Sequence, residues 1–250
     1  KKVADKLQSM FNNDKADYES KWDDIGVFIH YGMLTDDKFF EKAEKFSLLK
    51  SASNTFFTAE ELQEKVKETQ KDKQGDIIFL YANSKEEQFT AIQEAAERGW
   101  EVVLLDGPLA SHYISRFEQK NSGVKFKRVD ADVMDRLIEK EEITASALSD
   151  DQKKGITSAL EKLVDTKRYH VEFANLSPKD APFVVTQNEF MRRMKEMQML
   201  QGMDTSMFPD MYNVIVNANN PVVKEQILSK EDEGERTENA THLYQLALLS

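Results

Sequence analysis

Asp106 is the residue whose position in the sequence best suits catalysis. It ends the run 100–106, whose apolar core predicts a buried strand, and it precedes Gly107-Pro108 and a helical pattern. Ligands of α/β proteins bind beyond the carboxyl ends of parallel strands, and the start of the next helix can hold an anion. An Asp at this place is also a good turn former or helix cap. Because no His, Lys or second carboxylate is placed to work with it, the pattern favours the structural role.

The other signatures of chemistry are missing from the sequence. The chain has no cysteine, and its nine glycines form neither a GxxxxGK[ST] nor a GxGxxG loop. Its four histidines are too widely spaced to make a zinc motif and are predicted to be ordinary surface or half-buried residues: His30, His112, His170 and His242. We therefore predict no catalytic residue, no cofactor site and no metal site in this chain.

Composition narrows the class of protein. The 250 residues carry a formal charge of −11, so a nucleic-acid partner is not expected. The longest uninterrupted aliphatic run is Val102–Leu105, far short of the ~20 residues that a membrane helix needs. The absence of cysteine fits a reducing compartment. Since the chain opens with KKVADKLQSM and stops at HLYQLALLS, we expect it to be part of a longer protein.

The segment 190–211, FMRRMKEMQMLQGMDTSMFPDM, holds seven of the ten methionines. On a helical wheel Phe190, Met194 and Met197 form a stripe, flanked by Met191 and Leu200. Such a stripe could belong to an ordinary core. However, Met199 projects to the opposite side, and three further methionines follow Gly202 in the sequence. Because methionine adapts to partners of different shape, the pattern favours an interaction surface.

The elements that would position these residues fall into three predicted regions. Residues 1–55 read as helices, with a break near Asn12-Asn13. Residues 56–142 begin with a helix from Ala59, capped by Thr58 and Glu61. They continue as strand, helix, strand, helix, strand, which predicts a small three-layer αβα unit with strands at 76–82, 100–106 and 124–130 and helices at 84–99 and 109–120.

The third region, 143–250, is predicted to be an α+β domain with a three-stranded sheet. A charged linker with helical character, 135–154, leads into it. Its strands are expected at 168–176, 181–186 and 211–218, with Asn188 capping the methionine-rich helix. The stretch EDEGERTEN is expected to be a solvated turn before a terminal helix at about 240–249. The fold class is thus mixed α/β and α+β.

Several strings in this order resemble the 90-kDa heat-shock chaperone family, in particular its bacterial branch. They are DIIFLYANS, GWEVVLLDGPLASHYISRFEQKNSGVKF, VEFANLSPKDAPFVVTQNEFMRRMKEM, VIVNANNPVVKE and LYQLALLS. The resemblance covers the whole chain. By this resemblance, the chain holds the last part of a middle domain, followed by a C-terminal domain that is truncated at its end. It implies a homodimeric, cytoplasmic, ATP-driven chaperone that binds partly folded client proteins. ATP, Mg and the catalytic arginine of the family would belong to parts that precede this chain.

The resemblance also implies which residues contact clients. The amphipathic helix of the C-terminal domain carries the first set, Phe190, Met191, Met194, Met197 and Leu200. The family's second contact is an aromatic residue early in a middle-domain helix, where this chain has His112 with Tyr113 beside it. Two alternatives remain open: a dimerisation or scaffold module with buried methionines, and an enzyme with its site near Asp106.

Overall fold

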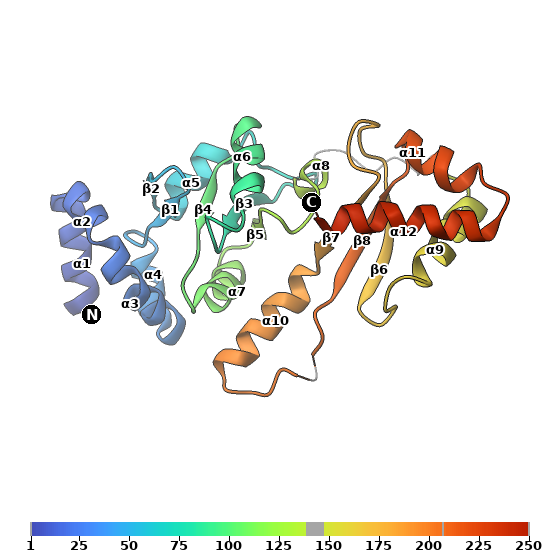
Figure 1. Ribbon diagram of the computed structural model, residues 1–250. Helices are drawn as coiled ribbons and strands as arrows, with labels where there is room; N and C mark the ends of the chain where they lie inside the picture. The colour runs from blue at the N-terminus through green and yellow to red at the C-terminus, as the bar shows by residue number, and fades with distance from the viewer. Residues whose placement is uncertain (1, 139–147, 207, 250) are drawn as a thin grey trace. The chain divides into compact units, whose positions relative to one another are not determined.

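The computed structural model describes residues 2–138, 148–206 and 208–249. Two compact units divide the chain: unit 1 comprises Lys1–Asp130 with Arg136–Lys140, and unit 2 comprises Ala131–Asp135 with Glu141–Ser250 (Figure 1). The segment 139–147 lies outside the described residues. It contains the middle part of the predicted linker 135–154 and the boundary that the sequence places after residue 142.

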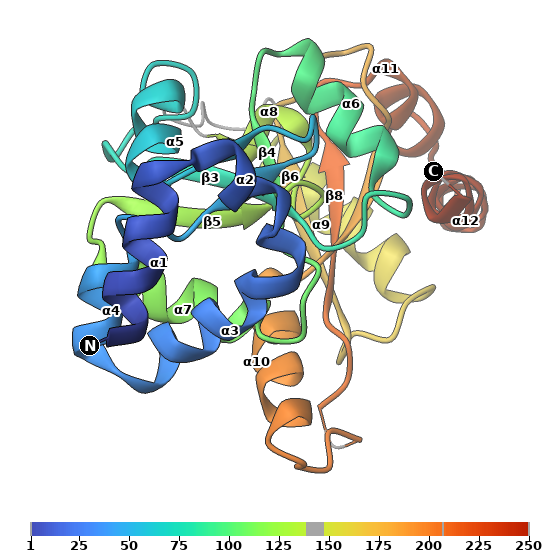
Figure 2. The ribbon, with the colours of Figure 1, turned by 90° about the vertical axis from the view of Figure 1, so that its left-hand side faces the viewer.

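Unit 1 opens with four helices within the region predicted to be helical: α1 Lys2–Asn13, α2 Lys15–Ser20, α3 Trp22–Thr35 and α4 Asp37–Ala43. The first break falls at Asp14, whose carboxylate caps α2 by accepting a hydrogen bond from the backbone N–H of Asp17 at 3.0 Å. Tyr18 and Trp22 are buried in the core of the unit. Figure 2 shows these helices in front of the sheet.

The sheet of unit 1 has five strands, in the order β2-β1-β4-β3-β5. The three predicted strands are confirmed and pair in parallel: β3 Ile77–Ala82, β4 Val102–Leu104 and β5 Val124–Arg128. Two short strands that the sequence analysis did not predict extend the sheet: β1 Leu49–Ser51, antiparallel to β4, and β2 Phe56–Phe57 at the edge. The predicted three-layer unit is therefore present with a wider sheet.

Helices cover both faces of this sheet: α5 Ala59–Val66, α6 Phe89–Glu97 and α7 Ala110–Lys120. The capping box of Thr58 and Glu61 is confirmed at the start of α5. The connections from β3 to β4 and from β4 to β5 run in opposite directions along the sheet, which places α6 and α7 on opposite faces (Figure 1).

A hydrogen-bonded network fills the carboxyl end of β3 and β5. The side-chain amide of Gln88 accepts from the backbone N–H groups of Asn83 and Ser84 at 2.8 and 3.0 Å and donates to Asp130 at 2.7 Å. Arg128 also donates to Asp130. The prediction that α6 begins near Ser84 is therefore wrong by several residues, because residues 83–88 form this turn instead.

Unit 2 is an α+β domain around a three-stranded sheet in the order β6-β8-β7. β8 Tyr212–Asn217 lies between β6 Tyr169–Ala174, which is parallel to it, and β7 Phe183–Gln187, which is antiparallel. The other elements of unit 2 are α9 Asp150–Glu161, α10 Glu189–Leu200, α11 Pro221–Val223, the π-helical turn η1 Lys224–Leu228 and α12 Glu233–Leu249. The short helix α8 Met134–Leu137 spans the division between the two units. The mixed fold class predicted from the sequence is confirmed.

The terminal helix α12 begins earlier than predicted. Most of EDEGERTEN is helical from Glu233, so its assignment to a solvated turn is wrong. Asp232 accepts a hydrogen bond from the N–H of Glu235 at 2.9 Å, as a capping residue does. The two acidic residues of the first turn, Glu233 and Glu235, also suit the positive end of the helix dipole.

Candidate functional site

The helix α10 belongs to an excursion of the chain between two paired strands. β7 ends at Gln187, whose partner in the register is Tyr212 at the start of β8. Just beyond this pair, the N–H of Asn188 donates to the carbonyl of Met211 at 2.7 Å and closes the base of the excursion. Figure 1 shows α10 extending away from the sheet of its own unit, with the chain returning beside it.

Local signals define both ends of α10. The side chain of Asn188 accepts a hydrogen bond from the N–H of Met191 at 3.0 Å, which confirms the predicted cap. Gly202 ends the helical stretch with φ of +72°, a left-handed conformation that glycine adopts without the steric penalty of a side chain. The following loop is joined to the helix by the Lys195 ammonium, which lies 2.8 Å from the carboxylate of Asp210.

The charged side of α10 carries its buried residue, Arg192, which is 6% exposed. Glu189 accepts hydrogen bonds from Arg192 at 3.0 Å and from Arg193 at 2.8 Å, and Arg192 also pairs with Glu196. These partners stand three or four residues apart, where side chains on a helix meet. Buried guanidinium groups need such partners, so the network allows Arg192 to be buried.

The apolar residues of this segment face solvent. Phe190 is 70% exposed, Met194 40% and Met199 59%; Met191 and Met197 are half-buried. The interpretation of Phe190 and Met194 as part of a core is therefore wrong for this chain. We call the exposed set the methionine-rich surface; it comprises Phe190, Met194, Met199, Leu200, Met203 and Phe208. Met207 lies outside the described residues.

The loop part of this surface lies in the segment 190–211 that the sequence predicts to be an interaction surface, although Met203 and Phe208 are not among the client contacts that the family resemblance implies. Met203 is 55% exposed and Phe208 is 41% exposed. The available sequence signal is the position of both residues beyond Gly202, where the helical spacing ends and no regular element covers them. An exposed apolar set of this kind is typical of an interaction site.

The other two predicted contacts lie in unit 1, on α7. His112 is partly buried, and its Nδ1 atom is buried without a hydrogen-bond partner among the described residues. Tyr113 is only 2% exposed and stacks on His30, with ring centroids 4.1 Å apart. Burial raises the pKa of the Tyr113 hydroxyl. Because its ring is part of the core, Tyr113 is withdrawn from the set of direct contacts.

The structure places Asp106 beside a cavity of about 320 Å³ that Asp23, His30 and Lys50 also line. A His, a Lys and a second carboxylate therefore lie near it, contrary to the expectation from the sequence. His112 is not among the lining residues. Within the described part of the chain, no three His, Cys, Asp or Glu side chains are grouped so as to hold a metal ion.

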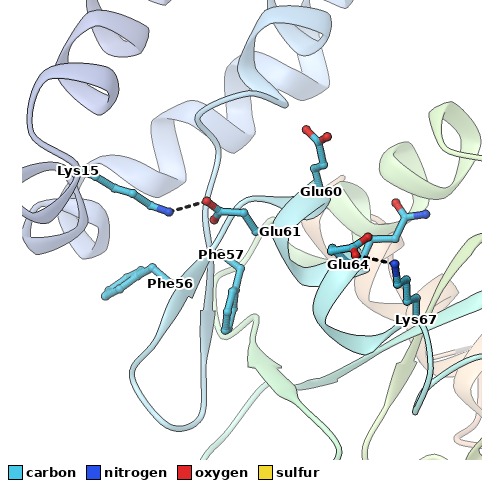
Figure 3. A pocket seen from close by; sticks show the side chains of 8 residues that line it. Lys15, Phe56, Phe57, Glu60, Glu61, Glu64 and Lys67 are labelled. Carbon is cyan, nitrogen blue, oxygen red and sulfur yellow. Dashed lines mark hydrogen bonds and ion pairs between the residues drawn. The ribbon is translucent and has the colours of Figure 1, made fainter.

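An open groove of about 790 Å³ lies beside β2 and α5 (Figure 3). Phe56 and Phe57 supply its apolar wall. Two ion pairs occupy most of its charges: Lys15 with Glu61 at 2.6 Å and Lys67 with Glu64 at 2.5 Å. Glu60 is the remaining charged residue of the lining.

Comparison with known proteins identifies the class of this chain. The sequence profile of the family described as Hsp90 protein matches residues 1–250. The chain therefore belongs to the Hsp90 family, as its sequence motifs suggest. No helix within the described ranges combines the length and apolar character that a bilayer crossing requires.

Similar relatives are bacterial proteins named Chaperone protein HtpG. The one from Bacteroides thetaiotaomicron is 43% identical over 237 residues, and the one from Porphyromonas gingivalis is 39% identical over 238 residues. Each match covers 93% of this chain but 35% of the relative, so the chain spans about a third of their length. A solved middle domain of a Plasmodium falciparum heat shock protein matches 51% of the chain at 14% identity, with a TM-score of 0.39.

Proposed function

We propose that this chain is part of an ATP-dependent molecular chaperone and that its methionine-rich surface binds partly folded client proteins. The main structural support for this proposal is the orientation of α10. Its charged side holds the buried Arg192, whereas Phe190 and Met194 are exposed to solvent. A helix that only completed a core would present the opposite side. The membership of the Hsp90 family supports the proposal.

The chemistry of this surface suits reversible capture. Methionine side chains are flexible and polarizable, so one set of residues can adapt to many apolar segments. Burial of a few such side chains at ~25 cal/mol per Å² yields a few kcal/mol. Association and ordering costs offset much of that gain, which keeps single-site affinity low. Weak binding of this kind allows a client to be released.

The rest of the functional assignment follows the family resemblance. His112 is the second proposed client contact. Tyr113 is left out because its side chain is buried. ATP and Mg would bind in the portion of the full-length protein that this chain does not span, and no described residue is given a catalytic role. We place the protein in the cytoplasm. The formal charge of −11 argues against a nucleic-acid partner.

Self-association is the second candidate function, and the end of α12 favours it. Leu246 is 63% exposed, Leu248 53% and Leu249 85%, so this helix presents apolar side chains that a second copy of the chain could cover. A homodimer would join two copies of the methionine-rich surface in one assembly. Sedimentation of the wild-type chain and of a Leu246→Ser/Leu249→Ser variant tests this assignment.

Suppression of aggregation tests client binding. The chain is mixed with a heat-destabilised protein and light scattering is followed for the wild type and for Met194→Glu/Met199→Glu, which changes two exposed residues of the methionine-rich surface. We expect the double variant to lose most of the suppression, because two carboxylates would have to be desolvated against an apolar client. Phe28→Ser is the matched control, since Phe28 is 74% exposed on α3 of unit 1 and is not part of the methionine-rich surface.

Two results would contradict this proposal. Equal suppression by the wild type and the double variant would remove the methionine-rich surface from client binding. Loss of a dimer in the double variant, with no effect on light scattering, would favour the scaffold alternative instead. Sedimentation on the same samples separates these outcomes.

A further inference from the structure

The cavity of about 320 Å³ in unit 1 has the features of a small binding site. Its residues come from α3, from Lys50 of β1 and from the segment 104–110 that joins β4 to α7. The volume is at the lower end of the range for small-ligand sites. The whole lining belongs to one compact unit, so the cavity does not depend on how the two units are arranged.

One wall of the cavity is aromatic. The ring centroids of Trp22 and His30 lie 5.7 Å apart, and His30 stacks in turn on Tyr113. Gly26 makes this packing possible, because a Cβ atom at this position would lie 2.9 Å from Cε2 of Trp22. The wall is therefore set by close packing.

His30, one of the lining residues, carries an unsatisfied polar atom. Its Nε2 atom is buried and has no hydrogen-bond partner among the described residues. Burial lowers the pKa of the imidazole to about 4, so the ring is neutral near pH 7. A buried nitrogen of this kind costs free energy unless a partner is supplied.

The charges around the cavity leave one carboxylate uncompensated. Asp23 and Lys50 neutralise each other in an ion pair of 2.7 Å. Asp106 is exposed, and within the described residues its side chain has no ion pair or hydrogen bond. At the start of α7, the N–H of Ala110 is already bonded to the carbonyl of Gly107 at 3.1 Å. The balance of charge therefore favours a cation over an anion.

We propose that this cavity binds a guanidinium or primary ammonium cation, with the carboxylate of Asp106 as its ion-pair partner and Trp22 as its aromatic wall. Carboxylates pair with such cations through charge-assisted hydrogen bonds, and aromatic rings attract them further. The cation could be a free small molecule or the side chain of an arginine or lysine in another polypeptide. The proposal is independent of client binding by α10.

Fluorescence of Trp22 provides the test. The chain has two tryptophans, so Trp100→Phe leaves Trp22 as the reporter in the full chain. Agmatine represents the free cation, the peptide acetyl-Gly-Arg-Gly-amide represents the polypeptide source, and acetate is the anionic control. We expect a saturable change with at least one cation. The Asp106→Asn substitution should weaken binding roughly 10- to 100-fold, through loss of an ionic hydrogen bond.

Glu97→Gln is the matched control for charge, because Glu97 is exposed on α6 and does not line the cavity. It should leave the affinity unchanged. The relative affinities of agmatine and the peptide then identify the source of the cation. The proposal is overturned if neither cation gives a saturable signal, if acetate binds equally well, or if Asp106→Asn binds as the parent does while its thermal unfolding midpoint is unchanged.

Discussion

Asn188 and Met211 are joined by a backbone hydrogen bond of 2.7 Å, and the side chain of Asn188 caps α10 at the same time. One residue thus closes the base of the excursion and starts the helix that carries the methionine-rich surface. The start of the helix is tied to the paired ends of β7 and β8. The helix that carries the exposed apolar side chains therefore has its first turn held in place by the ends of these two strands.

Substitution Asn188→Ala separates these two roles. The backbone bond to Met211 can remain, whereas the cap on the N–H of Met191 is lost. We expect α10 to lose about 1 kcal/mol of local stability. Hydrogen exchange of amides in its first turn should quicken roughly fivefold. Asn188→Asp keeps a capping oxygen and should exchange like the wild type. Unchanged exchange in Asn188→Ala would show that the cap contributes little.

Two glycine substitutions in helices should have opposite effects on stability. Gly26→Ala places Cβ 2.9 Å from the Trp22 ring and should cost ~1–3 kcal/mol through overpacking. Gly155 lies inside α9, where a Cβ atom would meet no other group within 4 Å, so Gly155→Ala should stabilise by ~0.5–1 kcal/mol. Urea denaturation measures both effects. Equal effects of the two variants would contradict the packing argument.

The sequence predicts most of this fold because the main elements carry strong local signals. The buried apolar runs locate β3 and β4, and Asn188 marks the start of α10. The strands β1 and β2 are too short, at three and two residues, to show alternation, and the register with β4 that stabilises β1 is a long-range property. Such pairing cannot be read from a local window.

The candidate site was harder to predict. A helical wheel shows that α10 has two chemically different sides, but it does not say which side faces the protein. Here the charged side holds the buried residue, Arg192. His112 and Tyr113 raise a related difficulty, since adjacent residues on a helix point about 100° apart. Tyr113 is the one in the core, where its ring stacks on His30. The sequence alone does not show this long-range contact.

Gln70 should be important for the stability of unit 1. Its side chain is fully buried, donates to the carbonyl of Ile78 at 2.9 Å and accepts from the N–H of Glu101 at 2.6 Å. Gln70→Ala leaves these backbone groups without a partner and should cost about 2–3 kcal/mol. Gln63→Ala, at an exposed position on α5, should change stability by less than ~0.5 kcal/mol. A similar urea midpoint for both variants would refute this assignment.

Stability of unit 1 should fall with acid because of His30. Burial lowers the pKa of its imidazole from 6.5 to about 4 in the folded state, so the unfolded chain binds the proton more readily. The free energy of unfolding is highest above pH ~6.5, where His30 is neutral in both states. It decreases by up to about 3 kcal/mol as the pH falls toward ~4, because the unfolded chain takes up the proton first. His30→Phe keeps a ring but cannot titrate, so its unfolding free energy should fall less over this interval. Urea unfolding followed by tryptophan fluorescence measures both profiles, since Trp22 and Trp100 both lie in unit 1. Parallel profiles would show that protonation of His30 is not linked to folding.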